Sequence, residues 1–185
     1  METIQAEATI EIAAPAQQVF DYLVDLSRHP EWVANVSKVT PLTDGPARVG
    51  SRYRASEGPP PVSTGRRILS MIPFIGGLIG GAKPYSEAEI TAIEPGRRVA
   101  WSALLPKGEG AFNRVDWEIV LEPAAGGTRL IQRSIWKPPT RGARRMIAAR
   151  GDGPGISGAM LQSLRRLKTR LEQAGAPVAR PAAAS

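Results

Sequence analysis

The chain has 185 residues, enough for one domain with a substantial core, and 42% hydrophobic and 22% charged residues, as expected of a globular protein. It contains no cysteine and one histidine, which excludes disulfides, thiolate metal sites and a cysteine nucleophile. The net charge of +7 is concentrated between Lys137 and Arg170, a segment that contains nine basic residues and one acidic residue. The N-terminal segment has no signal-peptide pattern, and with the missing cysteines it favours a cytoplasmic location.

The first elements are expected to be a strand followed by two short helical segments. Apolar residues alternate with Thr, Gln and Glu from Ile4 to Ile12, which is the pattern of a half-buried strand. Pro15 then stands where a helix begins, and the following residues give that helix one apolar face. Asp25 to Trp32 predicts a second short helical turn or loop.

The rest of the chain is expected to hold further strands and one long helix. Strand-like segments follow at about 34–41, 48–56, 86–94, 97–105, 111–122 and 128–136, separated by turn signals such as Glu94-Pro95-Gly96. Short turns between strands predict an antiparallel sheet. After a glycine-broken stretch at 151–155, an apolar stripe from Ile156 to Leu171 predicts a helix over about 156–173.

Several segments together carry a family resemblance. They are the opening run APAQQVFDYLVDLSRHPEW at 14–32, the turn EPGRR at 94–98, the hairpin LEP…GGT at 121–128 and the closing LRRLKTRLE. In this order they resemble START-like proteins of the SRPBCC superfamily, of the polyketide cyclase/dehydratase type. The resemblance implies an α+β helix-grip fold of the START/Bet v 1-like kind. In that fold a curved antiparallel β-sheet wraps around a long C-terminal α-helix, with two short helices after the first strand. One domain over 1–174 and a flexible tail at 175–185 are expected.

No recognisable catalytic or cofactor-binding motif emerges from the residues. One histidine and no cysteine leave only carboxylates as metal ligands, and these show no ligand spacing, so neither a metal nor a cofactor is predicted. The glycines at 76–81 miss the spacing of a phosphate loop. His29 precedes Pro30 and is expected on an extended or turn backbone, in a structural or surface role. The alternative role is an acid or base at a cavity mouth.

Strand alternation predicts one polar and aromatic inner face. If Val49 and Ser51 face inward, Tyr53 does so too, and the same parity applies to the later strands. The predicted ligand-binding set is Tyr53, Trp101, Asn113, Trp117, Gln132, Ser134 and Trp136. Such a face suits a large flat apolar ligand, and the alternative is a filled core. Asp116 falls on the opposite face and is expected to be solvated.

The segment 57–85 is expected to be an insertion that acts as an apolar lid over the cavity. Its large apolar residues cannot all remain exposed, and the run is too short to span a membrane. They must lie on the protein, on a second copy in a homodimer, or in a membrane interface, where 66–83 would make a peripheral contact. The lid residues are Ile68, Met71, Phe74, Ile75, Leu78 and Ile79.

Three functions are consistent with the sequence. The first is binding of a hydrophobic small molecule of the polyketide, lipid or isoprenoid class in an internal cavity. The second is an enzyme of the cyclase/dehydratase kind that shapes its substrate there, with Tyr53, His29 or Tyr85 as the proton shuttle. The third is a basic protein associated with a membrane or RNA through 137–170. The lack of aromatic residues beyond Trp136 disfavours nucleic acid.

Overall fold

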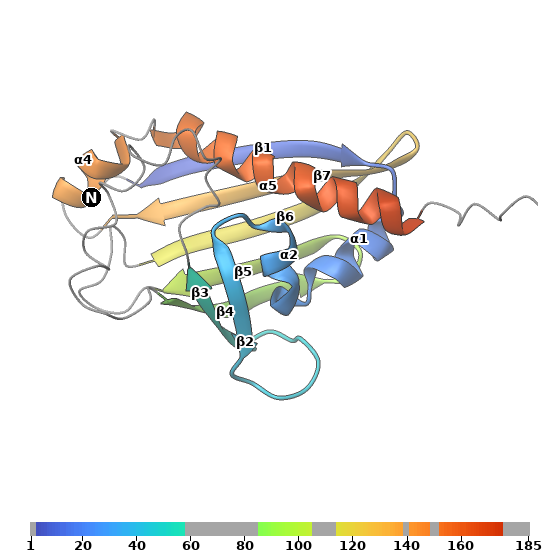
Figure 1. The fold of residues 1–185 in the computed structure, drawn as a ribbon, viewed down its shortest axis with the longest axis horizontal. Coiled ribbons are helices and arrows are strands. Elements are labelled where there is room, and N and C mark those ends of the chain that lie inside the picture. Colours follow the sequence, from blue (N-terminus) through green and yellow to red (C-terminus); the bar gives the residue numbers. More distant parts are fainter. Residues whose placement is uncertain (1–2, 58–84, 105–113, 139–140, 149–151, 176–185) are drawn as a thin grey trace, which may run out of the picture.

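The structure is a computed structural model, which describes residues 3–57, 85–104, 114–138, 141–148 and 152–175 (Figure 1). Its strands are β1 (Ile4–Ile12), β2 (Val36–Pro41), β3 (Arg52–Glu57), β4 (Tyr85–Glu94), β5 (Arg98–Leu104), β6 (Arg114–Ala124) and β7 (Gly127–Lys137). Its helices are α1 (Ala16–Leu23), the 3-10 turn η1 (Leu26–Arg28), α2 (His29–Trp32), α4 (Arg141–Ala148) and α5 (Asp152–Gly175).

The strands form one antiparallel sheet that curves around α5, so the predicted helix-grip fold is confirmed (Figure 1). The strand order is β1-β7-β6-β5-β4-β3-β2, in which β1 pairs with β7 and the remaining strands pair with their neighbours in the chain. The stripe of α5 that the helical period predicted is buried in the core, and its buried apolar members are Met160, Leu164, Leu167 and Leu171. The core therefore lies between α5, the short helices and one face of the sheet.

Helix α5 covers the free edge of β1, which pairs on its other edge with β7. Ser157 of α5 accepts a hydrogen bond from the Glu7 backbone N–H at 3.2 Å, and Glu172 accepts one from the Ala13 N–H at 2.8 Å. Lys168 Nζ donates to the Glu11 carbonyl at 2.7 Å. An uncovered strand edge offers unpaired backbone groups to other chains, and these side chains occupy part of that edge.

The boundaries of the last helices differ from the prediction. The glycine-broken stretch at 151–155 does not interrupt α5, which begins at Asp152 rather than near Ile156. Pro154 lies in its first turn, where a missing N–H removes no helical hydrogen bond. Gly153 lies so close to β1 that an added Cβ would stand 2.6 Å from the Gln5 carbonyl oxygen. The chain between β7 and α5, for which the sequence predicted no element, also contains α4, a basic helix in which Arg141 and Arg145 are exposed.

The prediction for the start of the third strand was wrong at one residue. Ser51 and Tyr53 are buried as expected, but Val49 is 60% exposed. Gly50 has φ +85°, and the chain turns there before β3 begins at Arg52. Alternation holds only while the backbone stays extended, so the parity of β3 does not reach back to Val49.

Thr128, fully buried at the start of β7, provides a test of the link between β7 and the entry to α1. Its hydroxyl donates to the Ala14 carbonyl at 2.7 Å. Thr128→Val keeps the shape but leaves that buried carbonyl without this donor, so we expect a loss of about 1–2 kcal/mol in the free energy of unfolding. Urea unfolding of both proteins at pH 7 measures it. An unchanged midpoint would show that the carbonyl finds water instead.

The predicted lid, its six apolar residues and most of 57–85 lie outside the described residues, as does nearly all of the tail at 175–185. The lid, the homodimer and the membrane contact through 66–83 therefore stay predictions, as does the cytoplasmic location. Among the described residues, no helix has the length and hydropathy needed to cross a membrane.

Candidate functional site

A row of aromatic rings crosses the face of the sheet that points toward α5. His29 lies against Trp101 of β5, with ring centroids 5.2 Å apart. Trp101 and Trp117 of β6 are stacked at 6.2 Å with planes 14° apart, and Trp117 meets Trp136 of β7 edge to face at 5.7 Å. We call these four residues the aromatic row. Offset-stacked and edge-to-face contacts are the geometries that aromatic rings prefer.

The strand register builds this row. Trp101 pairs with Trp117 across β5 and β6, Trp117 pairs with Ser134 across β6 and β7, and Ser134 pairs with Ala6 of β1. Paired residues of neighbouring strands point to the same face. Since Trp101 also pairs with Ile90 of β4, one continuous line of side chains runs from β4 to β1.

Two polar side chains of this face, Ser134 and Gln132, differ in their hydrogen bonding. The Ser134 hydroxyl accepts a hydrogen bond from Trp136 Nε1 at 2.9 Å and donates to Met160 Sδ of α5 at 3.6 Å. It therefore links the aromatic row to the helix. Gln132 is 4% exposed, and its Oε1 is buried with no hydrogen-bond partner among the described residues.

The Asp25 carboxylate acts electrostatically on two buried titratable side chains, His29 of α2 and Tyr53 of β3. His29 is 9% exposed, and its Nε2 is buried with no partner in the described part of the chain. Burial lowers the pKa of His29 to about 4, against the opposing effect of the Asp25 carboxylate. Burial also raises the pKa of Tyr53, and Asp25 raises it further. At neutral pH, His29 is therefore a neutral imidazole and Tyr53 a neutral phenol.

The prediction for the His29 backbone was wrong, although its structural role is consistent with the contacts. His29 has φ −49° and ψ −41°, so it is helical although a proline follows it. Pro30 stands at the start of α2, where a proline is accommodated. The spacing of Leu26, His29 and Trp32, each three residues apart and all buried, is the sequence signal that assigns His29 to the inner side of this helical segment.

The predicted inner-face residues lie on one face as the alternation required. Six of them lie on this face, and they are Tyr53, Trp101, Trp117, Gln132, Ser134 and Trp136. Asn113 lies outside the described residues. Whether these side chains contact a ligand stays a prediction. The sequence reasoning did not place His29 in the row, because its partner Trp101 is distant in the chain.

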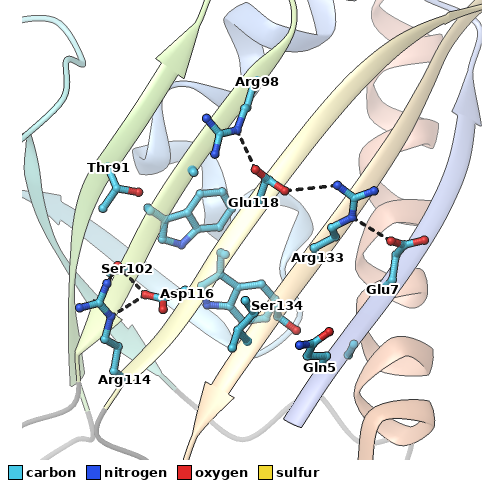
Figure 2. Close-up of a pocket in the computed structure, with 15 residues that line it drawn as sticks. Gln5, Glu7, Thr91, Arg98, Ser102, Arg114, Asp116, Glu118, Arg133 and Ser134 are labelled. Carbon is cyan, nitrogen blue, oxygen red and sulfur yellow. Dashed lines mark hydrogen bonds and ion pairs between the residues drawn. The ribbon is translucent and has the colours of Figure 1, made fainter. Parts of the chain in front are cut away.

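The opposite face of the sheet carries a shallow groove of about 500 Å³ whose rim is a ladder of charges. Figure 2 shows Glu118 between Arg98 and Arg133, and Arg133 next to Glu7. Arginine and carboxylate alternate, so the charges compensate one another. Exposed pairs of this kind contribute little stability each. This arrangement is consistent with a solvated outer surface and differs from the apolar inner face.

Asp116 lies on this outer face, as predicted. Partial burial acts to raise its pKa, but hydrogen bonds from Lys137, Ser102 and Arg114 outweigh that effect and lower the pKa to about 2. Lys137 Nζ is 2.7 Å from Asp116 Oδ2, and Arg114 Nε is 2.6 Å from Oδ1. The Asp116 carboxylate is thus ionised at neutral pH and already held by neighbouring side chains.

The basic residues between 137 and 170 do not form one uniform surface. Lys137 pairs with Asp116, and Arg170 pairs with Glu31 at 3.1 Å. Lys168 pairs with Glu172 at 3.4 Å. Part of the basic excess is therefore neutralised by carboxylates of β6, of α2 and of α5 itself. Among the described residues, no group of three or more His, Asp and Glu is arranged to hold a metal ion.

The curved antiparallel sheet, closed by α5 and lined by aromatic side chains, defines a helix-grip protein of the SRPBCC superfamily. Residues 3–172 match the model of the family described as polyketide cyclase / dehydrase and lipid transport, and the chain belongs to this family. Among curated proteins, the comparison finds no match.

Solved structures show the same fold at low sequence identity. The aromatase/cyclase Zhui from Streptomyces sp. R1128 is 15% identical, with a TM-score of 0.67 over 95% of this chain and 100% of that chain. The major latex-like protein 151 from Panax ginseng is 11% identical, with a TM-score of 0.62 over 91% of this chain and 97% of that chain. At such identities the likeness concerns the fold.

Proposed function

We propose that the protein binds a hydrophobic small molecule of the polyketide, lipid or isoprenoid class between the sheet and α5. The observation that carries this proposal is the aromatic row, which presents indole rings from three neighbouring strands on one inner face. Aromatic side chains with a few polar groups are typical of small-molecule sites. Family membership supports the proposal, because the family description includes lipid transport.

Native mass spectrometry of the purified full chain tests this function. We expect a co-purifying apolar compound, or a mass shift after incubation with a panel of polyketides, fatty acids and isoprenoids. Tryptophan fluorescence provides a second measurement, because ligand next to Trp101 and Trp117 should change their emission. A protein that stays empty with every member of the panel would contradict the proposal.

A second candidate is an enzyme of the cyclase/dehydratase kind, in which the same interior shapes a reactive chain. The favouring observation is that Asp25 acts electrostatically on both His29 and Tyr53, two buried groups able to exchange protons. Tyr85, the third shuttle considered from sequence, pairs with Ser56 across β3 and β4, and its ring lies 5.0 Å from the Arg54 guanidinium. It belongs to the charged outer side, so His29 and Tyr53 are the candidates that the geometry favours.

Turnover is tested with a linear poly-β-ketone thioester, followed by liquid chromatography and mass spectrometry. An enzyme should dehydrate this substrate faster than the buffer control does. The rate should be lower in His29→Phe and in Tyr53→Phe. Binding without conversion would leave the protein as a carrier.

A further inference from the structure

The two sides of the fold differ in how their basic residues are paired. On the outer face of the sheet, arginines lie next to carboxylates of neighbouring strands, as Arg133 does between Glu7 and Glu118. These charges compensate one another within the protein. The other side of the fold is formed by α5, which covers the inner face of the sheet (Figure 1). On that side the compensation is incomplete.

Four arginines of the last two helices have no acidic partner in the part of the chain that the structure describes. They are Arg165 and Arg166 of α5 and Arg141 and Arg145 of α4, and all four are exposed. The ion pairs of this region involve other basic side chains. The positive charges of these four arginines therefore remain available to an external anion.

The helical period places Arg165 and Arg166 on the solvent face of α5. Leu164 and Leu167, which flank them in the chain, are fully buried against the sheet. Exposed positions recur every three or four residues on the opposite side of the helix. These positions are Gly158, Gln162, Arg165, Arg166, Thr169 and Gln173. They include no carboxylate, no aromatic ring and no large apolar side chain.

This composition favours a lipid surface over a nucleic acid as the anionic partner. Both present rows of phosphates to a basic surface. Proteins that bind single-stranded nucleic acid also stack bases on aromatic side chains, and the solvent face of α5 has none. Basic residues alone are enough for attraction to the anionic headgroups of a bilayer. Without large apolar side chains, the contact stays at the level of the headgroups.

We propose that the solvent face of α5, through Arg165 and Arg166 and with the help of Arg141 and Arg145 of α4, docks the protein on an anionic lipid bilayer. The contact is electrostatic and therefore reversible. The choice of a bilayer rests on the proposed function, because a carrier of apolar molecules has to exchange them with a membrane. The charge arrangement itself does not depend on any ligand.

Co-sedimentation of the full chain with lipid vesicles tests this contact without an apolar ligand. Vesicles of phosphatidylcholine alone are compared with vesicles that also contain phosphatidylglycerol. We expect binding to the anionic vesicles only, and its loss at about 1 M salt, where the Debye length is about 3 Å. The double variant Arg165→Gln/Arg166→Gln should bind about 25-fold more weakly, since each basic residue near an anionic surface contributes about five-fold. Arg141→Gln/Arg145→Gln should also weaken binding.

A matched control removes two charges from the opposite side of the fold. Arg129→Gln/Arg133→Gln changes the net charge by the same amount on the outer face of the sheet. Its vesicle binding should stay within about 2-fold of the parent, because charges farther away than a Debye length are screened. Glutamine and arginine have similar helix propensities, so the α5 variant should keep the urea midpoint of the parent.

Three results would overturn the inference. The first is that neither kind of vesicle binds the parent. The second is an equal loss of binding in the outer-face control and in the α5 variant, since net charge and not this face would then drive the attraction. The third is a loss of affinity for single-stranded RNA in the α5 variant with unchanged vesicle binding, which would make the face a nucleic-acid interface.

The vesicle experiment and the ligand experiment can fail separately. A protein that carries an apolar compound in native mass spectrometry but ignores anionic vesicles keeps the proposed function and loses the docking surface. A protein that binds the vesicles through Arg165 and Arg166 but stays empty with the whole ligand panel keeps the docking surface and loses the proposed function.

Discussion

Trp101→Ala is expected to lower the free energy of unfolding by about 3–5 kcal/mol, the range for truncating a buried tryptophan. Trp101 is 6% exposed and contacts both His29 and Trp117, so its removal opens a cavity in the middle of the aromatic row. Urea unfolding at pH 7 measures the loss. The same variant should bind apolar ligands more weakly, because one wall of the proposed site is missing.

Two further variants separate packing from binding. Leu104→Ala truncates a side chain of the same strand that is 48% exposed, and we expect a change within about 0.5 kcal/mol. Trp101→Phe keeps an aromatic wall and should recover most of the binding that Trp101→Ala loses. A Trp101→Ala protein as stable as the parent would show that the interior around β5 is loosely filled.

Lowering the pH from 7 to 5 is expected to cost the protein about 2 kcal/mol of stability through His29 alone. The pKa of the unfolded histidine is near its ordinary value of 6.5, whereas burial lowers the pKa of the folded one to about 4. Between these values the unfolded state binds more protons, so stability falls as the pH falls. The contribution of His29 is fully present above about pH 6.5 and is progressively lost toward pH 4.

His29→Phe isolates this effect, because phenylalanine keeps a ring against Trp32 and Trp101 and does not titrate. Urea unfolding at pH 7 and at pH 5 gives the loss of unfolding free energy between the two pH values. This loss should be about 2 kcal/mol smaller in His29→Phe than in the parent. Asp25→Asn should increase the loss at pH 5, because the Asp25 charge opposes the lowering of the His29 pKa. Equal pH dependence in parent and His29→Phe would show that His29 is solvated.

The element order and the inner face could be predicted from sequence because both follow from local backbone geometry. Successive side chains of a strand alternate between faces, so Trp117 could be assigned with Ile119 and Leu121 before any pairing was known. The apolar stripe of α5 likewise follows from the helical period. The same local reasoning failed at Val49 and at 151–155. The turn at Gly50 and the close packing of α5 against β1 decide those boundaries.

The contacts of the site were decided by the tertiary structure. Trp101, Trp117 and Trp136 form one row because of the register of three strands, and register depends on pairing between distant segments. His29 joins that row through the docking of a short helix, which no local pattern specifies. His29 Nε2 and Gln132 Oε1 are both buried without a hydrogen-bond partner among the described residues, which the packing of distant segments decides. The sequence by itself thus determined which residues face inward, since alternation is a property of the extended backbone. Only the tertiary structure decided which of them touch and which lose their hydrogen-bond partners, since both depend on how distant segments pack.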